Sequence, residues 1–286
     1  MIDLHDVTYA RLGTRDLAGA TDFATRILGL ELVRQGKGCA YFRSDSRDHT
    51  LCYFEGDPSD HTLAFEVGDG EQLSRAASEL EAAGFSVHQG TQEECEQRFV
   101  HSFVRFHDLT GNKIELAWRP YVSGRRYFPS RDAGITGFSH VGLCSTDPAR
   151  DEAMWTGVFN ARVSDWIGPS ALLRIDDIHH RVALFPTTRS GIQHINHQVE
   201  TVDDIMRSWY FLQEEGIKVV FGPGRHPTSG ARFLYFEGPD GMIFEYSCGV
   251  SAIENEDTHR PRQFPLEPSG FCMWGSKPDI AEFKSD

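Results

Sequence analysis

The chain has 286 residues, of which 40% are hydrophobic and 24% charged, an ordinary composition for a soluble globular protein and a length that suggests two domains. No apolar run reaches the roughly 20 residues that cross a bilayer, and the N-terminus lacks the basic-then-apolar plan of a signal peptide. A formal net charge of −14 leaves no basic stripe for nucleic acid, and six scattered cysteines indicate reduced thiols in a cytoplasm.

The first half of the chain alternates short strands with two helices. A strand is expected at 9–12, and Asp16 then caps a helix. Strands follow at 40–42, 51–54 and 61–67. A second helix runs over 70–83 and ends at a glycine, and two hairpin strands close the half.

The second half repeats this order. A strand at 138–143 precedes a helix capped by Asp147, whose following proline suits the first helical position. The next elements are three strands and a helix, at 171–175, 182–185, 192–199 and 202–215. The half ends in an aromatic strand at 233–236, a turn of sequence GPDG and a returning strand at 242–247.

Three pairs of segments show an internal repeat at an offset of 130 or 131 residues. They are YARLGTRD at 9 with HVGLCSTD at 140, HTLCYFEG at 49 with HRVALFPT at 180, and FHDLTGNKIELAW at 106 with FEGPDGMIFEYSC at 236. We therefore predict an α+β fold of two tandem domains, each built from two βαβββ units that form a cupped mixed sheet. The predicted boundaries are a first domain at 1–120, a linker at 121–136, a second domain at 137–250 and a tail at 251–286.

The tail has no periodicity but keeps Phe264, Phe271 and Trp274. It is either disordered or an ordered cover over a pocket, because these side chains are too apolar for a solvated segment. Six aromatic residues either line an apolar substrate pocket or belong to the core: Trp155, Trp166, Trp209, Phe233, Phe264 and Phe271.

Glu245 lies inside the last strand, between Phe244 and Tyr246. It faces solvent or it faces inward, and an inward carboxylate costs several kcal/mol unless it is paired or bound to a metal. His226 and Tyr235 lie on the same short ribbon as Glu245, so the three form a plausible half of an active site.

Histidines distinguish the second half from the first. His140 lies on the opening strand and His194 on the third strand group, where the first half has Tyr9 and Thr62. Two imidazoles and a carboxylate such as Glu245 suit an iron(II) ion with open coordination positions. A lone strand histidine is more often an ordinary core or surface residue, and that alternative stays open.

The chain resembles the two-domain type I extradiol dioxygenases of the vicinal oxygen chelate (glyoxalase/bleomycin resistance) superfamily over about residues 5–250. The metal ligands of that family correspond to His140 in FSHVGL, His194 in QHINHQVETVDD and Glu245 in GMIFEYSCG. The resemblance implies that these three residues bind Fe²⁺, with Mn²⁺ as the alternative, and that the first domain lacks a complete metal site.

Further positions follow from the same resemblance. HHRVALF resembles the strand with the family's acid/base, which favours His180 over its neighbour His179. GPGRHPTSGARFLYFEGPDG resembles the family signature and implies that His226 and Tyr235 bind the substrate oxygens. In the first half, Glu115 is expected to be a structural residue paired with a nearby cation, Arg105 or Lys113.

The implied activity is extradiol cleavage of a substituted catechol with incorporation of both atoms of O2. A small aromatic diol and O2 are the implied partners, and a homo-oligomer is expected. Two alternatives stay open: another metal-dependent reaction of the superfamily, such as an isomerase or lyase, and a sequestering protein of the same fold that needs no metal.

Overall fold

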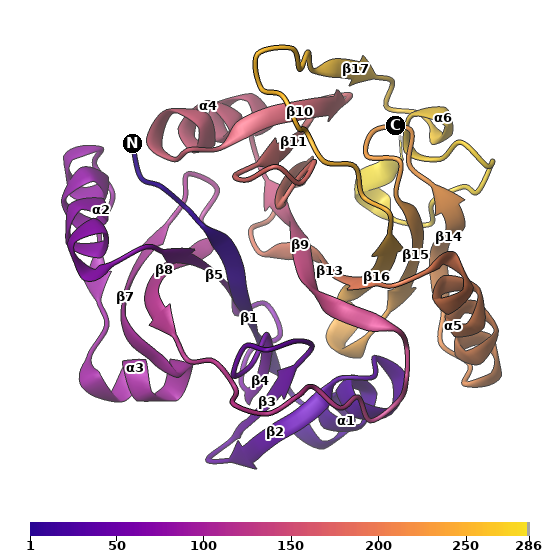
Figure 1. Ribbon diagram of the computed structural model, residues 1–286, viewed down its shortest axis with the longest axis horizontal. Helices are drawn as coiled ribbons and strands as arrows, with labels where there is room; N and C mark the ends of the chain where they lie inside the picture. Colours follow the sequence, from indigo (N-terminus) through magenta and orange to yellow (C-terminus); the bar gives the residue numbers. More distant parts are fainter. Residues whose placement is uncertain (285–286) are drawn as a thin grey trace.

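The computed structural model describes residues 1–284. Its strands form two sheets, with helices around the outside (Figure 1). The first sheet contains β1 (Asp6–Thr14), β2 (Glu31–Gly36), β3 (Cys39–Arg43), β4 (Leu51–Glu55), β5 (His61–Val67), β6 (His88–Gln89), β7 (Val100–His107) and β8 (Lys113–Pro120). The second contains β9 (Ile135–Ser145), β10 (Arg162–Ile167), β11 (Ser170–Arg174), β12 (Val182–Pro186), β13 (Ile192–Val199), β14 (Val219–Arg225), β15 (Arg232–Glu237), β16 (Ile243–Cys248) and β17 (Arg262–Phe264).

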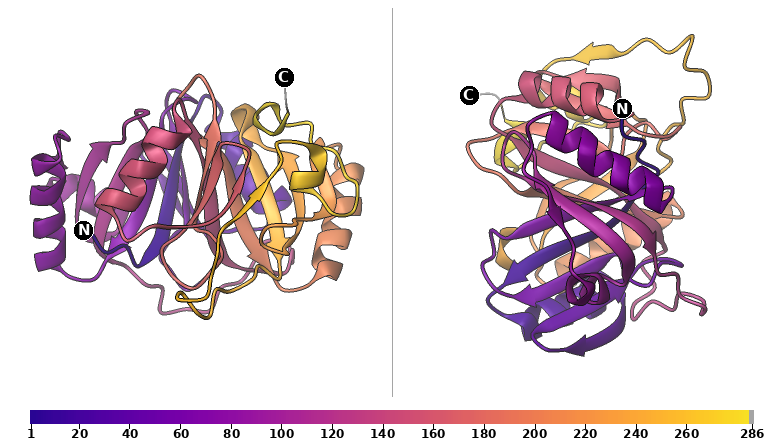
Figure 2. Two further views of the ribbon diagram at one scale, coloured as in Figure 1. Left: turned by 90° about the horizontal axis from the view of Figure 1, so that it is seen from above. Right: turned by 90° about the vertical axis from the view of Figure 1, so that its left-hand side faces the viewer.

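The α-helices are α1 (Leu17–Asp22), α2 (Gly70–Ala82), α3 (Gln92–Arg98), α4 (Pro148–Val158), α5 (Val202–Glu214) and α6 (Pro268–Phe271). A π-helical turn (Phe23–Ile27) continues α1, and 3-10 turns cover Pro239–Gly241 and Ala281–Phe283. Helices α2 and α5 lie at opposite ends of the molecule in both Figure 1 and Figure 2.

The two sheets repeat one pairing scheme. Their orders are β2-β3-β4-β1-β5-β8-β7-β6 and β14-β15-β16-β13-β9-β12-β11-β10-β17. β1 runs parallel to β4 and antiparallel to β5, and β9 has the same relation to β12 and β13. The predicted α+β fold of two tandem domains is therefore confirmed, while the exact boundaries at 120, 136 and 250 stay predictions.

Helix starts follow the expected capping chemistry. The side chain of Asp16 accepts from the Gly19 N–H at the start of α1, and Asp147 accepts from the Arg150 N–H at the start of α4. A side-chain acceptor satisfies one of the four N–H groups that a helix start leaves free. Both predicted caps are confirmed.

The two halves share one hydrophobic core. Buried residues of both sheets form a single cluster, in which the ring of Phe65 lies 5.5 Å from that of Trp155. The Tyr246 hydroxyl also donates to the Leu28 carbonyl at 2.9 Å and accepts from Arg131 at 2.8 Å. The second sheet is thus packed directly against the first.

Several elements were not predicted, among them β2, β10, β17 and α3. β2 is largely exposed, and α3 is a short polar segment that begins at a capping box between Thr91 and Glu94. Such elements bury little apolar surface, so they leave almost no hydrophobic period in the sequence.

The tail from 251 to 284 is ordered and packs on the second sheet, whereas the last two residues of the predicted tail lie outside the described residues. β17 pairs in parallel with β10, and Phe271 and Phe283 are each 1% exposed. Phe271 stacks on Phe283 at 4.7 Å, which holds the chain end against β14 and β15. Within residues 1–284, no helix is long and apolar enough to cross a bilayer.

Candidate metal centre

Three neighbouring strands bring His140, His194 and Glu245 together. His140 lies on β9, His194 on β13 and Glu245 on β16, and one donor atom of each lies within 4.8 Å of the others. Glu245 Oε2 is 3.0 Å from His140 Nε2 and 3.5 Å from His194 Nε2. All three residues are at most 2% exposed, so the protein holds a buried His-His-Glu site.

A glycine makes room for one of these imidazoles. His194 pairs with Gly142 on β9, and a Cβ added to Gly142 would lie 2.4 Å from His194 Nδ1. The ring of His194 therefore occupies the space that any other residue at Gly142 would fill.

Unpartnered atoms show what the site is built to hold. Buried His194 Nε2 and Glu245 Oε1 have no hydrogen-bond partner. His194 Nδ1 lies 2.5 Å from Gln193 Oε1, so Nδ1 carries the proton and Nε2 presents its lone pair. Each unsatisfied buried polar group costs about 1–3 kcal/mol. A cation at this point would satisfy them, and the donor set fits a divalent transition metal with open positions.

The protonation states of His194 and Glu245 suit metal binding. Burial lowers the pKa of His194 to about 3. Burial would raise the pKa of Glu245, but the hydrogen bond from His140 Nε2 at 3.0 Å and the other imidazoles around the carboxylate lower it overall. A neutral imidazole and a carboxylate are the forms that ligate metals.

His180 lies beside this site and His179 lies behind it. The His180 ring is 4.2 Å from the His140 ring, and burial lowers the pKa of His180 well below its usual value. His179 faces Asp165, with 3.0 Å between Nε2 and Oδ2, and its Nδ1 is 3.1 Å from His180 Nδ1. Arg262 on β17 donates to Asp165 at 2.6 Å. The two neighbouring histidines thus have different positions: His180 faces the site, and His179 links it to a buried carboxylate.

His226, which directly follows β14, and Tyr235 on β15 complete the group. Tyr235 pairs directly with Glu245 across β15 and β16, and its hydroxyl is 3.2 Å from His226 Nε2. His226 Nδ1 donates to the carbonyl of Phe271 at 2.8 Å, which leaves Nε2 free to act as an acceptor. A tail residue thus orients a histidine of the site.

The walls around Tyr235 are apolar. They are formed by sheet and tail residues that include Phe185, Phe221, Phe233, Phe271 and Phe283. Of the six aromatic residues proposed for a pocket, Phe233, Phe264 and Phe271 belong to this cluster, whereas Trp155, Trp166 and Trp209 pack on the main core.

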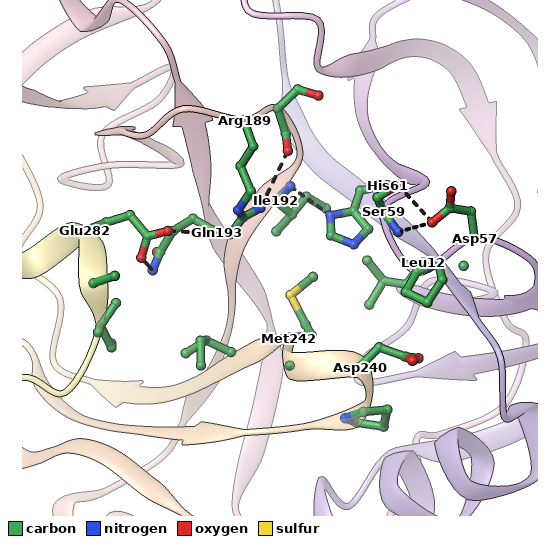
Figure 3. A pocket seen from close by; sticks show the side chains of 18 of the residues that line it. Leu12, Asp57, Ser59, His61, Arg189, Ile192, Gln193, Asp240, Met242 and Glu282 are labelled. Carbon is green, nitrogen blue, oxygen red and sulfur yellow. Dashed lines mark hydrogen bonds and ion pairs between the residues drawn. The ribbon is translucent and has the colours of Figure 1, made fainter.

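A separate cavity of about 650 Å³ opens between the two halves, and none of the six candidate site residues lines it (Figure 3). It touches the site through Gln193, whose Nε2 is 3.5 Å from Glu282 Oε2 (Figure 3). Glu282 also pairs with Arg189 at 3.5 Å. The chain end therefore supports the residue that fixes the tautomer of His194.

Comparison with known proteins identifies the family. Residues 6–116 and 137–246 each match the Glyoxalase/Bleomycin resistance protein/Dioxygenase superfamily. The chain belongs to this superfamily. Over 299 aligned residues it is 25% identical to a protein of Rhodococcus jostii (strain RHA1) named an iron-dependent extradiol dioxygenase, covering 96% of this chain and 97% of that one.

Solved structures share the fold over nearly the whole length. A halotolerant catechol dioxygenase superposes with a TM-score of 0.88 at 22% identity, covering 99% of this chain and 98% of that chain. A Mn(II)-bound glyoxalase from Novosphingobium aromaticivorans also gives 0.88, at 23% identity, covering 100% and 95%.

The first superfamily domain uses its equivalent positions differently. In the first sheet, Thr62 pairs with Arg11 and Lys113. In the second sheet, His194 pairs with Gly142 and Ile243. Thr62 is therefore the counterpart of His194. Glu115 accepts two bonds from Arg98 Nε, at 2.8 and 2.9 Å, and one from the Tyr9 hydroxyl at 2.8 Å. This carboxylate is already neutralised inside the protein.

The prediction that Glu115 pairs with Arg105 or Lys113 was wrong in part. Arg105 approaches Glu115 only to 3.8 Å, and Lys113 pairs with Asp60 instead. The main partner, Arg98, lies on the unpredicted helix α3. Sequence reasoning also missed Asp165, Gln193 and Glu282, because these polar residues carry no motif and act through partners distant along the chain.

Proposed function

We propose that this chain is an extradiol dioxygenase, which opens the ring of a substituted catechol beside its two hydroxyl groups and incorporates both atoms of O2. The observation that carries the proposal is the buried group of His140, His194 and Glu245, with its orphaned donor atoms. Fe²⁺ is the proposed ion because two histidines and one carboxylate leave positions open, as in oxygen-activating iron enzymes. Mn²⁺ is the alternative ion.

The other site residues have proposed roles that follow from their protonation states. When bound, the metal would supply adjacent positions for the diol oxygens and O2. His180, kept neutral by burial, would accept a proton from the diol and later return it. Burial and the charge of Glu245 raise the pKa of Tyr235 well above its usual value, so its phenol would remain a donor to a substrate oxygen. His226 would hold the second contact to the ring oxygens.

The surroundings suit a planar apolar ring. The phenylalanines of the Tyr235 cluster enclose the site, and the tail supplies Phe271 and Phe283 to that wall. We propose that residues 251–284 act as a cover that excludes water while the diol is bound. An open hydrated cleft would favour side reactions that this wall suppresses.

Two other functions compete with this one. Another metal-dependent reaction of the superfamily is favoured by one observation, the likeness to the Mn(II)-bound glyoxalase. A sequestering protein would need neither the orphaned donors nor the neutral His180. The relatives named as extradiol and catechol dioxygenases favour the first proposal.

The test is anaerobic reconstitution of the metal-stripped chain with Fe²⁺, followed by addition of O2 and a panel of 3- and 4-substituted catechols. A dioxygenase consumes one O2 per diol and gives a yellow ring-opened product. No O2 uptake with any catechol would reject the proposal. His194→Ala should remove bound metal and activity together, and Thr62→Ala, at the equivalent position of the first domain, should retain both.

Further proposals concern the setting of the enzyme. We propose a cytoplasmic location, which the six unpaired cysteines within residues 1–284 support. We also propose a homo-oligomer, which light scattering on a sizing column tests directly. The proposed domains at 1–120 and 137–250 are tested by limited proteolysis, which should cut first between them.

A further inference from the structure

The first domain contains a pocket of about 630 Å³ lined by β1, β2, β3, β4 and α3, which we call the N-terminal cup. It is the counterpart of the candidate metal centre. Its Phe54 precedes Phe185 by the repeat offset, and Phe185 packs 5.8 Å from the His194 ring. The cup contains none of the proposed catalytic residues, so ligand binding there is independent of the proposed activity.

The floor of the cup is a buried arginine. Arg11 stands where the second domain has Gly142, since Arg11 pairs with Cys52 as Gly142 pairs with Ala183. The Arg11 side chain lines the cup, is 7% exposed, and its Nη1 has no hydrogen-bond partner. A guanidinium that is buried with a free donor calls for an anionic acceptor, because an unsatisfied charged group is the most costly kind to bury.

The walls of the cup are aromatic. Tyr41, Phe54 and Phe99 line it, and Arg11 lies over the Phe54 ring at 5.6 Å. The guanidinium of Arg34 lies 3.5 Å from the centre of the Phe99 ring. Flat rings beside a cationic floor match a ligand that carries both an aromatic ring and a negative charge.

The rim limits the charge of that ligand. Glu55, Glu93 and Glu96 line the mouth and are exposed, against one exposed cation there, Lys37. Arg34 at the same mouth is already paired with Asp48, at 2.7 and 2.8 Å. Three carboxylates at the entrance disfavour phosphates and other multiply charged anions. A ligand with a single negative charge can still enter, because the cation of Arg11 compensates that charge.

We propose that the N-terminal cup binds a small aromatic monocarboxylate, with its carboxylate on Arg11 and its ring between Tyr41, Phe54 and Phe99. The Cys39 thiol also lines the cup. An anion bound to Arg11 opposes ionisation of this neighbouring thiol, so occupancy slows its alkylation.

The test is calorimetric titration of the full chain with 2-naphthoate, with the uncharged 2-naphthamide and inorganic phosphate as separate arms. Arg11→Met should weaken naphthoate binding about ten- to hundred-fold, the loss expected for a charged hydrogen bond. The exposed Arg75→Met is the matched control and should bind as the wild type does. Naphthamide and phosphate should bind at least tenfold more weakly than naphthoate.

A second variant keeps Arg11 intact. Gly36 lines the cup, and a Cβ added there meets no heavy atom within 4 Å, so Gly36→Phe adds a ring beside the pocket from an unobstructed Cβ. It should weaken naphthoate binding, whereas Gly124→Phe, whose Cβ is equally unobstructed and which lies outside the cup, should not. Naphthoate should also slow iodoacetamide labelling of Cys39, measured by mass spectrometry. Absence of binding, binding unchanged in both cup variants, or equal binding of phosphate would each overturn the proposal.

Discussion

Replacing Gly142 by alanine puts a methyl group where the ring of His194 lies. The new Cβ would be 2.4 Å from His194 Nδ1 and 2.9 Å from Gln193 Oε1, and ordinary contacts begin at 3.4 Å, so the ring must retreat by about 1 Å. His194, the proposed metal ligand, then moves away from His140 and Glu245. We expect metal affinity to fall about ten- to hundred-fold and turnover about hundred-fold, the usual effects of a displaced ligand or a 1 Å misplacement.

The assay compares metal content after dialysis against a graded chelator with kcat/KM for the best catechol. Gly157→Ala in α4 is the matched control, because a Cβ there meets nothing within 4 Å. That variant should gain roughly 1 kcal/mol from helix propensity and keep its metal. A Gly142→Ala protein that is folded, with wild-type metal affinity and activity, would refute the assignment of His194 as a ligand.

Three further predictions address charges around both sites. Asp165→Asn should lower kcat/KM and move the acidic limb of its pH profile to lower pH. The reason is that the Asp165 carboxylate favours the charged form of the His179–His180 pair. An unshifted profile would rule out this positioning role. Arg98→Met should destabilise the fold by about 3–5 kcal/mol in urea unfolding, since it leaves Glu115 buried and unpaired, and adding Glu115→Gln should restore much of the loss. A hydrogen bond with Cys52 and the charge of Arg11 lower the pKa of Cys39 to about 6 despite its partial burial. Alkylation of Cys39 should therefore reach half its maximal rate near pH 6. A midpoint above pH 8 would contradict this prediction.

Local chemistry explains why much of the fold was predictable. Asp16 and Asp147 mark helix starts because their side chains satisfy N–H groups only three residues away. The repeat offset predicted the matching strands of both sheets. The register equates Thr62 with His194, one residue beyond that offset, because a bulge in β13 between Ile192 and His194 shifts the pairing. Exposed β2 and short α3 escaped prediction because they bury too little apolar surface to leave a period.

The candidate site, like the fold, was predictable only in part. Sequence pattern and family resemblance, without any structure, pointed to His140, His194 and Glu245, since two imidazoles and a carboxylate suit a metal and match the ligand positions of the family. That their donor atoms meet within 4.8 Å depends on the order in which β16, β13 and β9 pair.

Only the tertiary structure decided the supporting contacts. The Asp165–His179 bond spans 14 residues, the His226–Phe271 bond 45 and the Gln193–Glu282 contact 89, and no local rule selects among partners so far apart. The same holds for Arg11, whose Nη1 becomes a buried donor without a partner only because four strands and a helix close around it. Sequence by itself determined which groups are chemically able to act, because that depends on residue type and strand alternation. Packing determined which of them face one another, because burial and long-range pairing are properties of the folded chain alone.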